Sequence, residues 1–122
     1  MNKSSIIAFV ATKDAQKSRA FYEKSLGLRF VSSDEFALVF DVNGTMLRIQ
    51  KVKDFKPQGF TVLGWKVADI RKVMAQLVKQ GVAFARYEGM GQDKEGVWSA
   101  PGGAKIAWFS DPDGNVLSLT EF

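Results

Sequence analysis

The side chains that most often carry out chemistry in proteins are missing from this sequence. None of its 122 residues is a cysteine or a histidine. The chain therefore has no thiolate nucleophile, no thiolate metal ligand and no disulfide. It also lacks the commonest metal ligand and the usual general base near neutral pH. Any reaction would depend on carboxylates, hydroxyls and basic side chains.

The carboxylates with the most suggestive spacing stand in two similar short motifs, Asp41-Val-Asn-Gly and Asp111-Pro-Asp-Gly. Their spacing lacks the full ligand set of a calcium loop, whereas Asp and Gly are favoured residues of tight turns. We therefore predict turns there rather than a cation site. Glu88 and Tyr87 remain as candidates for acid–base catalysis, although a solvated loop position is the favoured interpretation for both.

A second group of residues is suited to binding. Arg48 and Gln50 are two residues apart, as are Ser118 and Thr120, and this spacing places each pair on one face of a strand. Arg48 could hold an anionic group by charge-assisted hydrogen bonds. The residues expected to form walls around these groups are Phe9, Phe36, Leu38, Phe40, Trp98 and Trp108. Aromatic residues in strands are more often core than site, but the converging polar set and the cost of burying Arg48 without a partner favour a pocket.

Hydrophobic periodicity and turn signals give the elements that would position these residues. In the first half we expect a strand at 5–12, a helix at 15–26 and strands at 28–33, 36–42 and 46–52. After a linker at 54–59, we expect a strand at 60–67, a helix from 70 to 80 and strands at 82–87, 104–110 and 116–122. Asp14 and Asp69 would cap the two helices. The order β-α-β-β-β thus occurs twice.

The two halves align as an internal repeat. Asp14 aligns with Asp69 at an offset of 55 residues, and Asp41 aligns with Asp111 at an offset of 70. The difference marks a glycine-rich insert at 89–103, which is either a mobile cover over a site or a surface loop with Trp98 as its anchor. We predict one α+β domain, residues 1–122. Module one would span 1–53 and module two 60–122, and together they would form a curved mixed sheet around a cleft.

Strand alternation assigns residues to the two faces of each sheet. The helix would cover one face, for which Leu47, Ile49, Leu117 and Leu119 are suited, and the other face would line the cleft. The residues expected on the cleft side are Ile7, Phe9, Phe36, Leu38, Phe40, Arg48, Gln50, Val62, Trp108 and Ser118, with Trp98 from the insert. This lining is mostly apolar with a few polar groups, which is typical of small-molecule pockets.

Charge and composition restrict the partners. The formal net charge is +4 and the basic residues are scattered, so we expect no nucleic-acid partner. The first residues form a run too short and too mixed for a signal peptide or a membrane span. We therefore expect no membrane partner and a cytoplasmic location.

The stretches FVATKDAQKSRAFYEKSLGL and AWFSDPDGNVLSLTEF, together with the paired modules, resemble the vicinal oxygen chelate superfamily. That superfamily includes glyoxalase I, bleomycin-resistance proteins and extradiol dioxygenases. The resemblance covers nearly the whole chain and implies tandem βαβββ modules and a homodimer. It also implies that metal-dependent members would place their four ligands at the positions of Ile7, Arg48, Val62 and Ser118.

Those four residues do not suit a divalent cation, which needs nitrogen, oxygen or sulfur lone pairs and is repelled by a guanidinium. We therefore predict no metal and no cofactor, and we disfavour glyoxalase and dioxygenase activity, which depend on the ion. The expected function is the binding of a small, aromatic, neutral or anionic molecule in a metal-free cleft. The alternative is a metal-free lyase or isomerase that uses the same cleft, with Tyr87 or Glu88 as its acid–base group.

Overall fold

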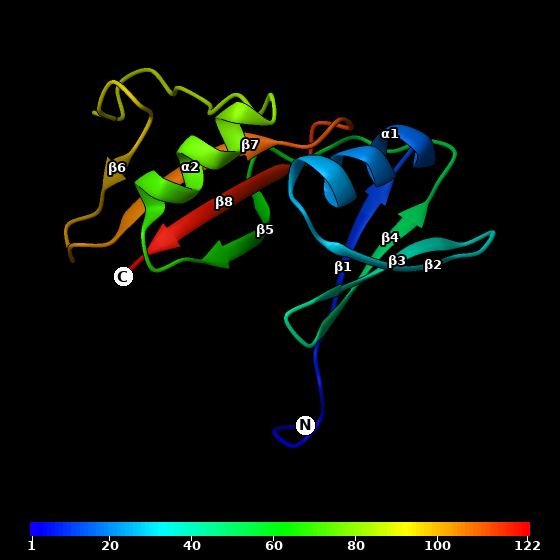
Figure 1. The fold of residues 1–122 in the computed structure, drawn as a ribbon. Helices are drawn as coiled ribbons and strands as arrows, with labels where there is room; N and C mark the ends of the chain where they lie inside the picture. The colour runs from blue at the N-terminus through cyan, green and yellow to red at the C-terminus, as the bar shows by residue number, and fades with distance from the viewer.

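Two similar modules stand side by side in the computed structural model, which describes residues 1–122 (Figure 1). Module one consists of β1 (Ile7–Thr12), α1 (Ala15–Ala20), the π-helical turn η1 (Phe21–Ser25), β2 (Arg29–Ser33), β3 (Ala37–Val42) and β4 (Thr45–Lys51). Module two consists of β5 (Thr61–Lys66), α2 (Ile70–Lys79), β6 (Trp98–Ser99), β7 (Lys105–Ser110) and β8 (Val116–Glu121).

Each module contains a four-stranded mixed sheet. The strand orders are β1-β4-β3-β2 and β5-β8-β7-β6, so the second sheet repeats the first. The first and last strands of each module are parallel neighbours, and the other pairs are antiparallel. This topology confirms the predicted α+β fold of two tandem βαβββ modules. Hydrogen bonds connect the strands within each module, so the curved surface is made of two sheets.

Both helices begin at the predicted caps. The Asp14 carboxylate accepts a hydrogen bond from the Lys17 backbone N–H at 3.2 Å, and Asp69 accepts one from Lys72 at the same distance. These bonds satisfy backbone donors that a helix leaves free in its first turn. None of the helices is long and apolar enough to cross a membrane.

The core lies between the helices and the sheets and continues from one module into the other. Tyr22 and Phe40 are fully buried in module one, and Phe109 and Leu117 are at most 1% exposed in module two. Phe21 bridges the two parts, with its ring centroid 6.5 Å from that of Phe109. The helix-side surfaces of the two sheets therefore share one hydrophobic core.

The edge of the second sheet differs from the prediction. The segment 82–87 does not form a strand, and only Phe84 makes an antiparallel bridge, with Phe109. Farther along the same edge, Trp98 pairs with Ile106 of β7. The insert thus supplies the short edge strand β6. Two segments, one at Phe84 and one at Trp98, pair with the edge of β7, and their local sequence does not indicate which of them forms the strand.

Candidate functional site

The side of the first sheet that faces away from the helix carries one charged group among apolar side chains. Arg48 on β4 is paired in register with Phe9 on β1 and Val39 on β3, so the three form a row across this face. Ile7 and Phe9 are 47% and 50% exposed, and Gln50 is exposed beyond them. Arg48 is half-buried and forms no ion pair or side-chain hydrogen bond. Backbone N–H groups, and more weakly the charge of Arg48, lower the pKa of the nearby Asp34 carboxylate. Because Asp34 forms no ion pair with Arg48, the guanidinium can still hold an anion.

Leu38 and Phe40 do not line this face, and their predicted position was wrong. The register pairs Leu38 with Ile49 and Phe40 with Leu47, and directly opposite residues in antiparallel strands share a face. All four are at most 3% exposed and lie in the core beneath the helix. Phe36 precedes β3 and is 68% exposed. Because Phe36 lies outside β3 and its paired residues, the register assigns it to neither face, and its predicted place on the cleft side stays a prediction.

The error comes from a difference between the two hairpin turns. In module one, two turn residues separate the paired Val42 and Thr45, whereas three residues, 112–114, separate the paired backbones in module two. The additional residue shifts the repeat by one, so that β3 aligns with β7 at an offset of 69 and β4 with β8 at 70. Val39 is therefore the counterpart of Trp108.

The open face of module two places Trp108 directly opposite Ser118, on the face predicted for both. Ser118 is 7% exposed and is paired in register with Gly64 of β5. A Cβ atom at Gly64 would lie only 2.7 Å from Ser118 Oγ, so the absence of a side chain makes room for the hydroxyl. Trp108 Nε1 donates a hydrogen bond to Thr61 Oγ1 at 3.1 Å, which fixes the indole ring over this face.

Further aromatic side chains surround Trp108. The ring centroid of Trp98 lies 6.1 Å from that of Trp108, and Tyr87 packs edge-on against Trp108 at 5.7 Å. Beside them opens a hollow of ≈ 590 Å³, lined by Gly59, Phe60, Thr61, Tyr87, Met90, Trp108 and Val116. Sequence reasoning missed Phe60 and Met90 as parts of this hollow. Alternation along the strand from Phe60 could have indicated the first, but no pattern points to the second.

The insert is tied to α2 by a cluster of hydrogen bonds. Asp93 accepts three backbone N–H bonds from residues 95–97 at 3.0–3.1 Å and an ionic bond from Arg71 at 2.8 Å. The Arg71 guanidinium, with these backbone donors, lowers the pKa of Asp93 to about 2. This anchoring favours a structured surface loop over a mobile cover. Glu88, the carboxylate considered for acid–base chemistry, is exposed in the preceding turn.

The carboxylates of the second turn motif join the two modules. Asp111 is 5% exposed; it accepts bonds from the Tyr22 hydroxyl at 2.6 Å and from Asn115 Nδ2 at 2.8 Å. Its other oxygen accepts two backbone N–H bonds within the turn, both at 2.9 Å. Asp113 accepts from Thr12 Oγ1 at 2.6 Å and from the following backbone N–H at 2.8 Å. The motif is thus a turn, as predicted, and both carboxylates have protein donors.

Tyr22 reaches this joint from η1, and its side chain is fully buried. Burial, together with the neighbouring Asp111 carboxylate, raises the pKa of the Tyr22 hydroxyl far above its ordinary value. Both effects disfavour a phenolate. The Tyr22 hydroxyl therefore stays protonated and donates its hydrogen bond to Asp111 over the whole ordinary pH range.

A second hollow brings together predicted residues from both modules. It measures ≈ 520 Å³ and lies where the linker passes β1 and β5. Three predicted site residues, Phe9, Gln50 and Val62, contribute to its lining, along with the linker residues 55–58. Val62 is 37% exposed there. The linker is thus part of the candidate site, although its sequence indicated only a connection.

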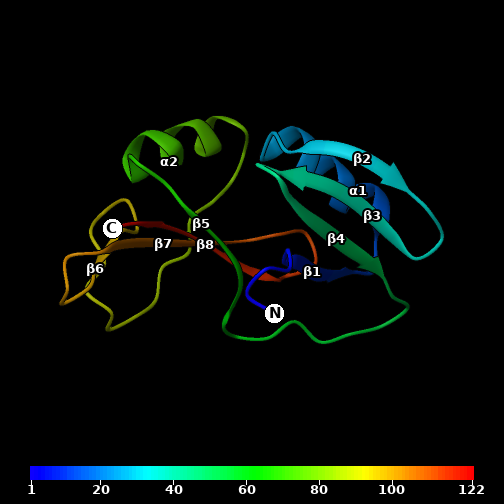
Figure 2. The same cartoon turned by 90° about the horizontal axis from the view of Figure 1, so that it is seen from below.

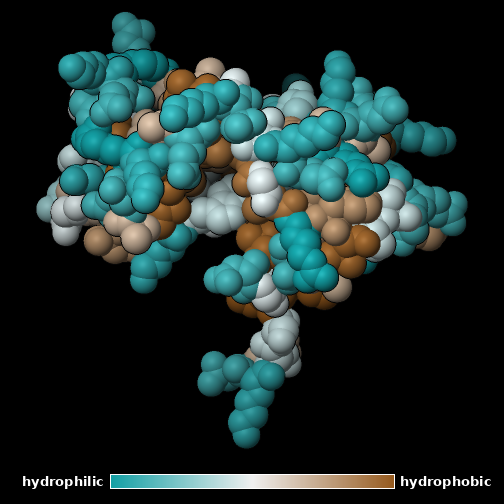
Figure 3. Space-filling view, viewed as in Figure 1, coloured by the Kyte–Doolittle hydropathy of each residue, from teal (hydrophilic) through white to brown (hydrophobic).

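The open faces of the two sheets do not face each other within the chain. Seen from below, the first sheet lies in front of α1, whereas the second is nearly edge-on beneath α2 (Figure 2). Apolar atoms gather over the lower part of the first lobe and along the hollow between the lobes (Figure 3). Ile7 and Arg48 therefore share one face, Val62 and Ser118 belong to the other sheet, and one chain does not enclose all four.

The four positions also fail to fit the metal ion that the resemblance implies. They offer two hydrocarbon side chains, one guanidinium and one hydroxyl, in place of the lone pairs that a divalent ion requires. Nowhere in the structure do three or more acidic, histidine or cysteine side chains gather as a potential metal site.

Comparison with known proteins gives a consistent family. Residues 6–119 match the model of the "Glyoxalase/Bleomycin resistance protein/Dioxygenase superfamily". No curated protein sequence matches the chain. A glyoxalase family protein from Enterococcus faecalis superposes with a TM-score of 0.79 at 22% identity, covering 99% of this chain and 100% of that one.

Two other similar structures carry more specific names. A lactoylglutathione lyase from Agrobacterium tumefaciens has a TM-score of 0.73 at 16% identity, with 97% of this chain and 93% of that chain covered. The fosfomycin resistance protein FosX from Listeria monocytogenes has a TM-score of 0.72 at 15% identity, with 100% and 95% covered. At such identities the likeness shows the fold alone.

Proposed function

Because the chain belongs to the glyoxalase/bleomycin resistance protein/dioxygenase superfamily, we propose that it is a metal-free member that binds a small aromatic molecule, neutral or anionic. The observation that carries this proposal is the unpaired Arg48, which lies in a row with Phe9 and Val39. An aromatic carboxylate would place its charge on the guanidinium and its ring against the apolar neighbours. No cofactor, nucleic acid or membrane is part of the proposal, and the expected location is the cytoplasm.

We further propose that two copies of the chain complete the site. Ile7, Phe9, Phe60 and Val62 lie between 37% and 62% exposed on or beside the open faces, and contiguous exposed apolar surface usually marks an interaction site. In a homodimer, module one of one copy would lie against module two of the other. Arg48 would then face the aromatic hollow around Trp108, and the site would have a charged and an aromatic wall.

The test is a titration with naphthalene-2-carboxylate followed by tryptophan fluorescence. Arg48→Gln keeps a polar side chain but removes the charge. A hydrogen bond to a charged group contributes about 1.5–3 kcal/mol, so we expect binding to weaken about ten- to hundredfold. Lys72→Gln is the matched control, because Lys72 is an exposed cation on α2.

The outcomes separate the parts of the proposal. Equal loss of affinity in both variants would mean that net charge, rather than Arg48, attracts the anion. Unchanged affinity in Arg48→Gln would remove Arg48 from the site. Sedimentation equilibrium at micromolar concentration tests the assembly, and a purely monomeric protein that still binds would contradict the role of a second copy.

A further inference from the structure

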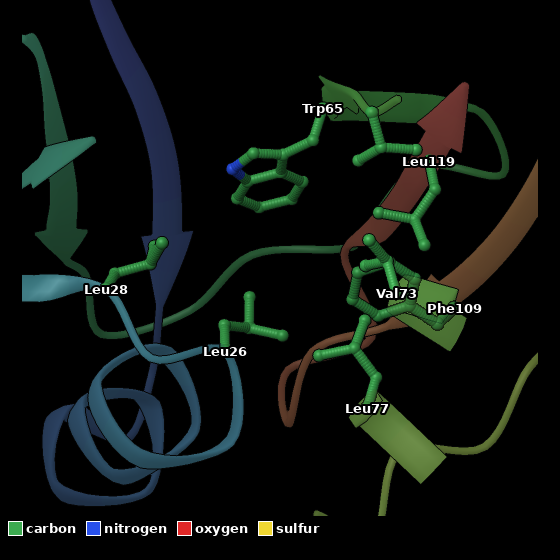
Figure 4. A pocket seen from close by; sticks show the side chains of 8 residues that line it. Leu26, Leu28, Trp65, Val73, Leu77, Phe109 and Leu119 are labelled. Atoms are coloured by element: carbon green, nitrogen blue, oxygen red, sulfur yellow. The ribbon is translucent and has the colours of Figure 1, made fainter. Parts of the chain in front are cut away.

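A third pocket lies between the modules on the helix side of the sheets, away from the open faces. Its empty space is ≈ 360 Å³, and all eight lining residues are hydrophobic: Leu26, Leu28, Trp65, Val67, Val73, Leu77, Phe109 and Leu119. Figure 4 shows leucines of module one on one side and the side chains of α2, β5, β7 and β8 on the other, all directed toward the same space. Neither the proposed function nor the family likeness assigns a role to this pocket.

The lining offers almost nothing to a polar molecule. Trp65 and Phe109 form a wall of nearly stacked rings, with centroids 6.4 Å apart and an interplanar angle of 25°. The only polar side-chain atom among the eight residues is the indole nitrogen of Trp65, for which the structure shows no hydrogen-bond acceptor. A bound water needs two to four polar partners, so water is a poor occupant.

We propose that this pocket binds a small, flat, neutral aromatic molecule without polar groups. Apolar cavities of about 150 Å³ in proteins stay dry and bind benzene; the comparable volume of this pocket is ≈ 100 Å³, and the pocket is open on one side. A fused two-ring hydrocarbon matches the ring wall of Trp65 and Phe109. The Trp65 nitrogen lies on the ring edge turned toward β1, away from Val73 and Phe109, so a ligand in the pocket needs no hydrogen-bond acceptor (Figure 4).

The position of the pocket gives its occupant a structural effect. Leu26 and Leu28 flank Gly27 at the end of the helical segment of module one, whereas Val73 and Leu77 come from α2 of module two. A ligand in contact with both sets stabilises the observed arrangement of the modules, because it binds the native state and not the unfolded chain.

The probe is naphthalene, and the readout is the indole N–H signals of the three tryptophans in ¹H–¹⁵N spectra of the unmodified protein. We expect the Trp65 signal to shift and those of Trp98 and Trp108 to stay in place. Shifts confined to Trp98 and Trp108 would overturn the proposal, because the neutral ring would then sit on the open face. No shift at all would overturn it as well.

A pair of valines on α2 provides a matched comparison. Val73 lines the pocket, whereas Val78 on the same helix is 57% exposed. Val73→Phe fills the space, and we expect it to weaken naphthalene binding at least tenfold; Val78→Phe leaves binding unchanged. Equal binding to Val73→Phe and the unmodified protein would refute the site.

The same variants keep this inference separate from the proposed function. Naphthalene-2-carboxylate binding depends on Arg48 and not on Val73, and naphthalene binding shows the opposite dependence. Either proposal can therefore fail while the other stands.

Discussion

Replacing Tyr22 by phenylalanine removes one hydroxyl from the joint between the modules and leaves the ring in place. The hydroxyl donates to Asp111 Oδ2 at 2.6 Å, and both groups are buried. After the substitution, Asp111 still accepts from Asn115 Nδ2 and from two backbone N–H groups. The carboxylate therefore loses one of four donors and does not become an unpaired buried charge.

The expected loss of stability follows from the number of donors that Asp111 keeps. A hydrogen bond to a charged group is worth about 1.5–3 kcal/mol, and the three remaining donors place this case near the lower end. For 122 residues, an unfolding entropy of about 2.1 cal/mol/K per residue converts about 1.5 kcal/mol into a fall in Tm of about 6 °C. Chemical denaturation at pH 7, with an unchanged m-value, measures the free energy of unfolding directly.

Tyr87→Phe is the control, because Tyr87 is 42% exposed and its hydroxyl has no protein partner. We expect that variant to change stability by less than about 0.5 kcal/mol, as surface substitutions usually do. If Tyr22→Phe cost no more than Tyr87→Phe, the joint would not be the stabilising contact that the distances indicate.

The pH dependence gives the same contact a second test. Because folding raises the pKa of Tyr22 above its ordinary value of 10.0, the stability linked to it is fully present below pH 10. Above pH 10 the unfolded chain releases the proton and the native state keeps it. The native state then loses about 1.4 kcal/mol per pH unit from this group. The stability advantage of the unmodified protein over Tyr22→Phe should accordingly shrink above pH 10, and an advantage that is constant up to pH 11 would contradict the assignment.

Two further changes test the packing of module two. In Gly64→Ala the new methyl group would lie 2.7 Å from Ser118 Oγ, and we expect the free energy of unfolding to fall by about 1 kcal/mol, a typical cost of overpacking. Adding Ser118→Ala should restore most of this stability in denaturant titrations. If it does not, the strain lies elsewhere. In the insert, the lowered pKa of Asp93, about 2 against an ordinary 3.8, contributes stability that is present above pH 4 and is lost as the pH falls toward 2. Acid titrations followed by near-ultraviolet circular dichroism should show a smaller change between pH 4 and 2 in Asp93→Asn, and identical profiles would exclude this carboxylate as the titrating group.

The sequence predicted the repeated element order and both helix caps because these depend on local signals. Asp14 and Asp69 stand directly before amphipathic segments, and the alternation around Arg48 and Ser118 holds in the structure. The faces of Leu38 and Phe40 were also accessible in principle. A two-residue turn after Val42 sets the register of the hairpin, and this register places both residues opposite core positions.

Other features depend on contacts that no local pattern contains. Trp98, which pairs with β7, belongs to an insert whose glycines do not indicate a strand. Phe84 pairs with another residue on the same edge of β7. The bond from Tyr22 to Asp111 joins residues 89 positions apart. The sequence places the donor within the predicted helix at 15–26 and the acceptor in a predicted turn, and only the packing of one module against the other brings them together.

The hydrogen bonds between the modules also determine how the open apolar faces are oriented. Tyr22 and Thr12 bind the carboxylates of Asp111 and Asp113, and Asn115 Nδ2 donates to the Ala11 carbonyl at 2.8 Å. These contacts fix the end of β1 against the β7–β8 turn. Rotating the modules until their open faces met would break several of them, at about 1–3 kcal/mol for each buried group left without a partner. A loosely linked pair of modules could close on a ligand within one chain. These contacts keep the open faces from meeting within one chain, and this is why the proposed site, with Arg48 and Trp108 together, draws on the complementary module of a second copy.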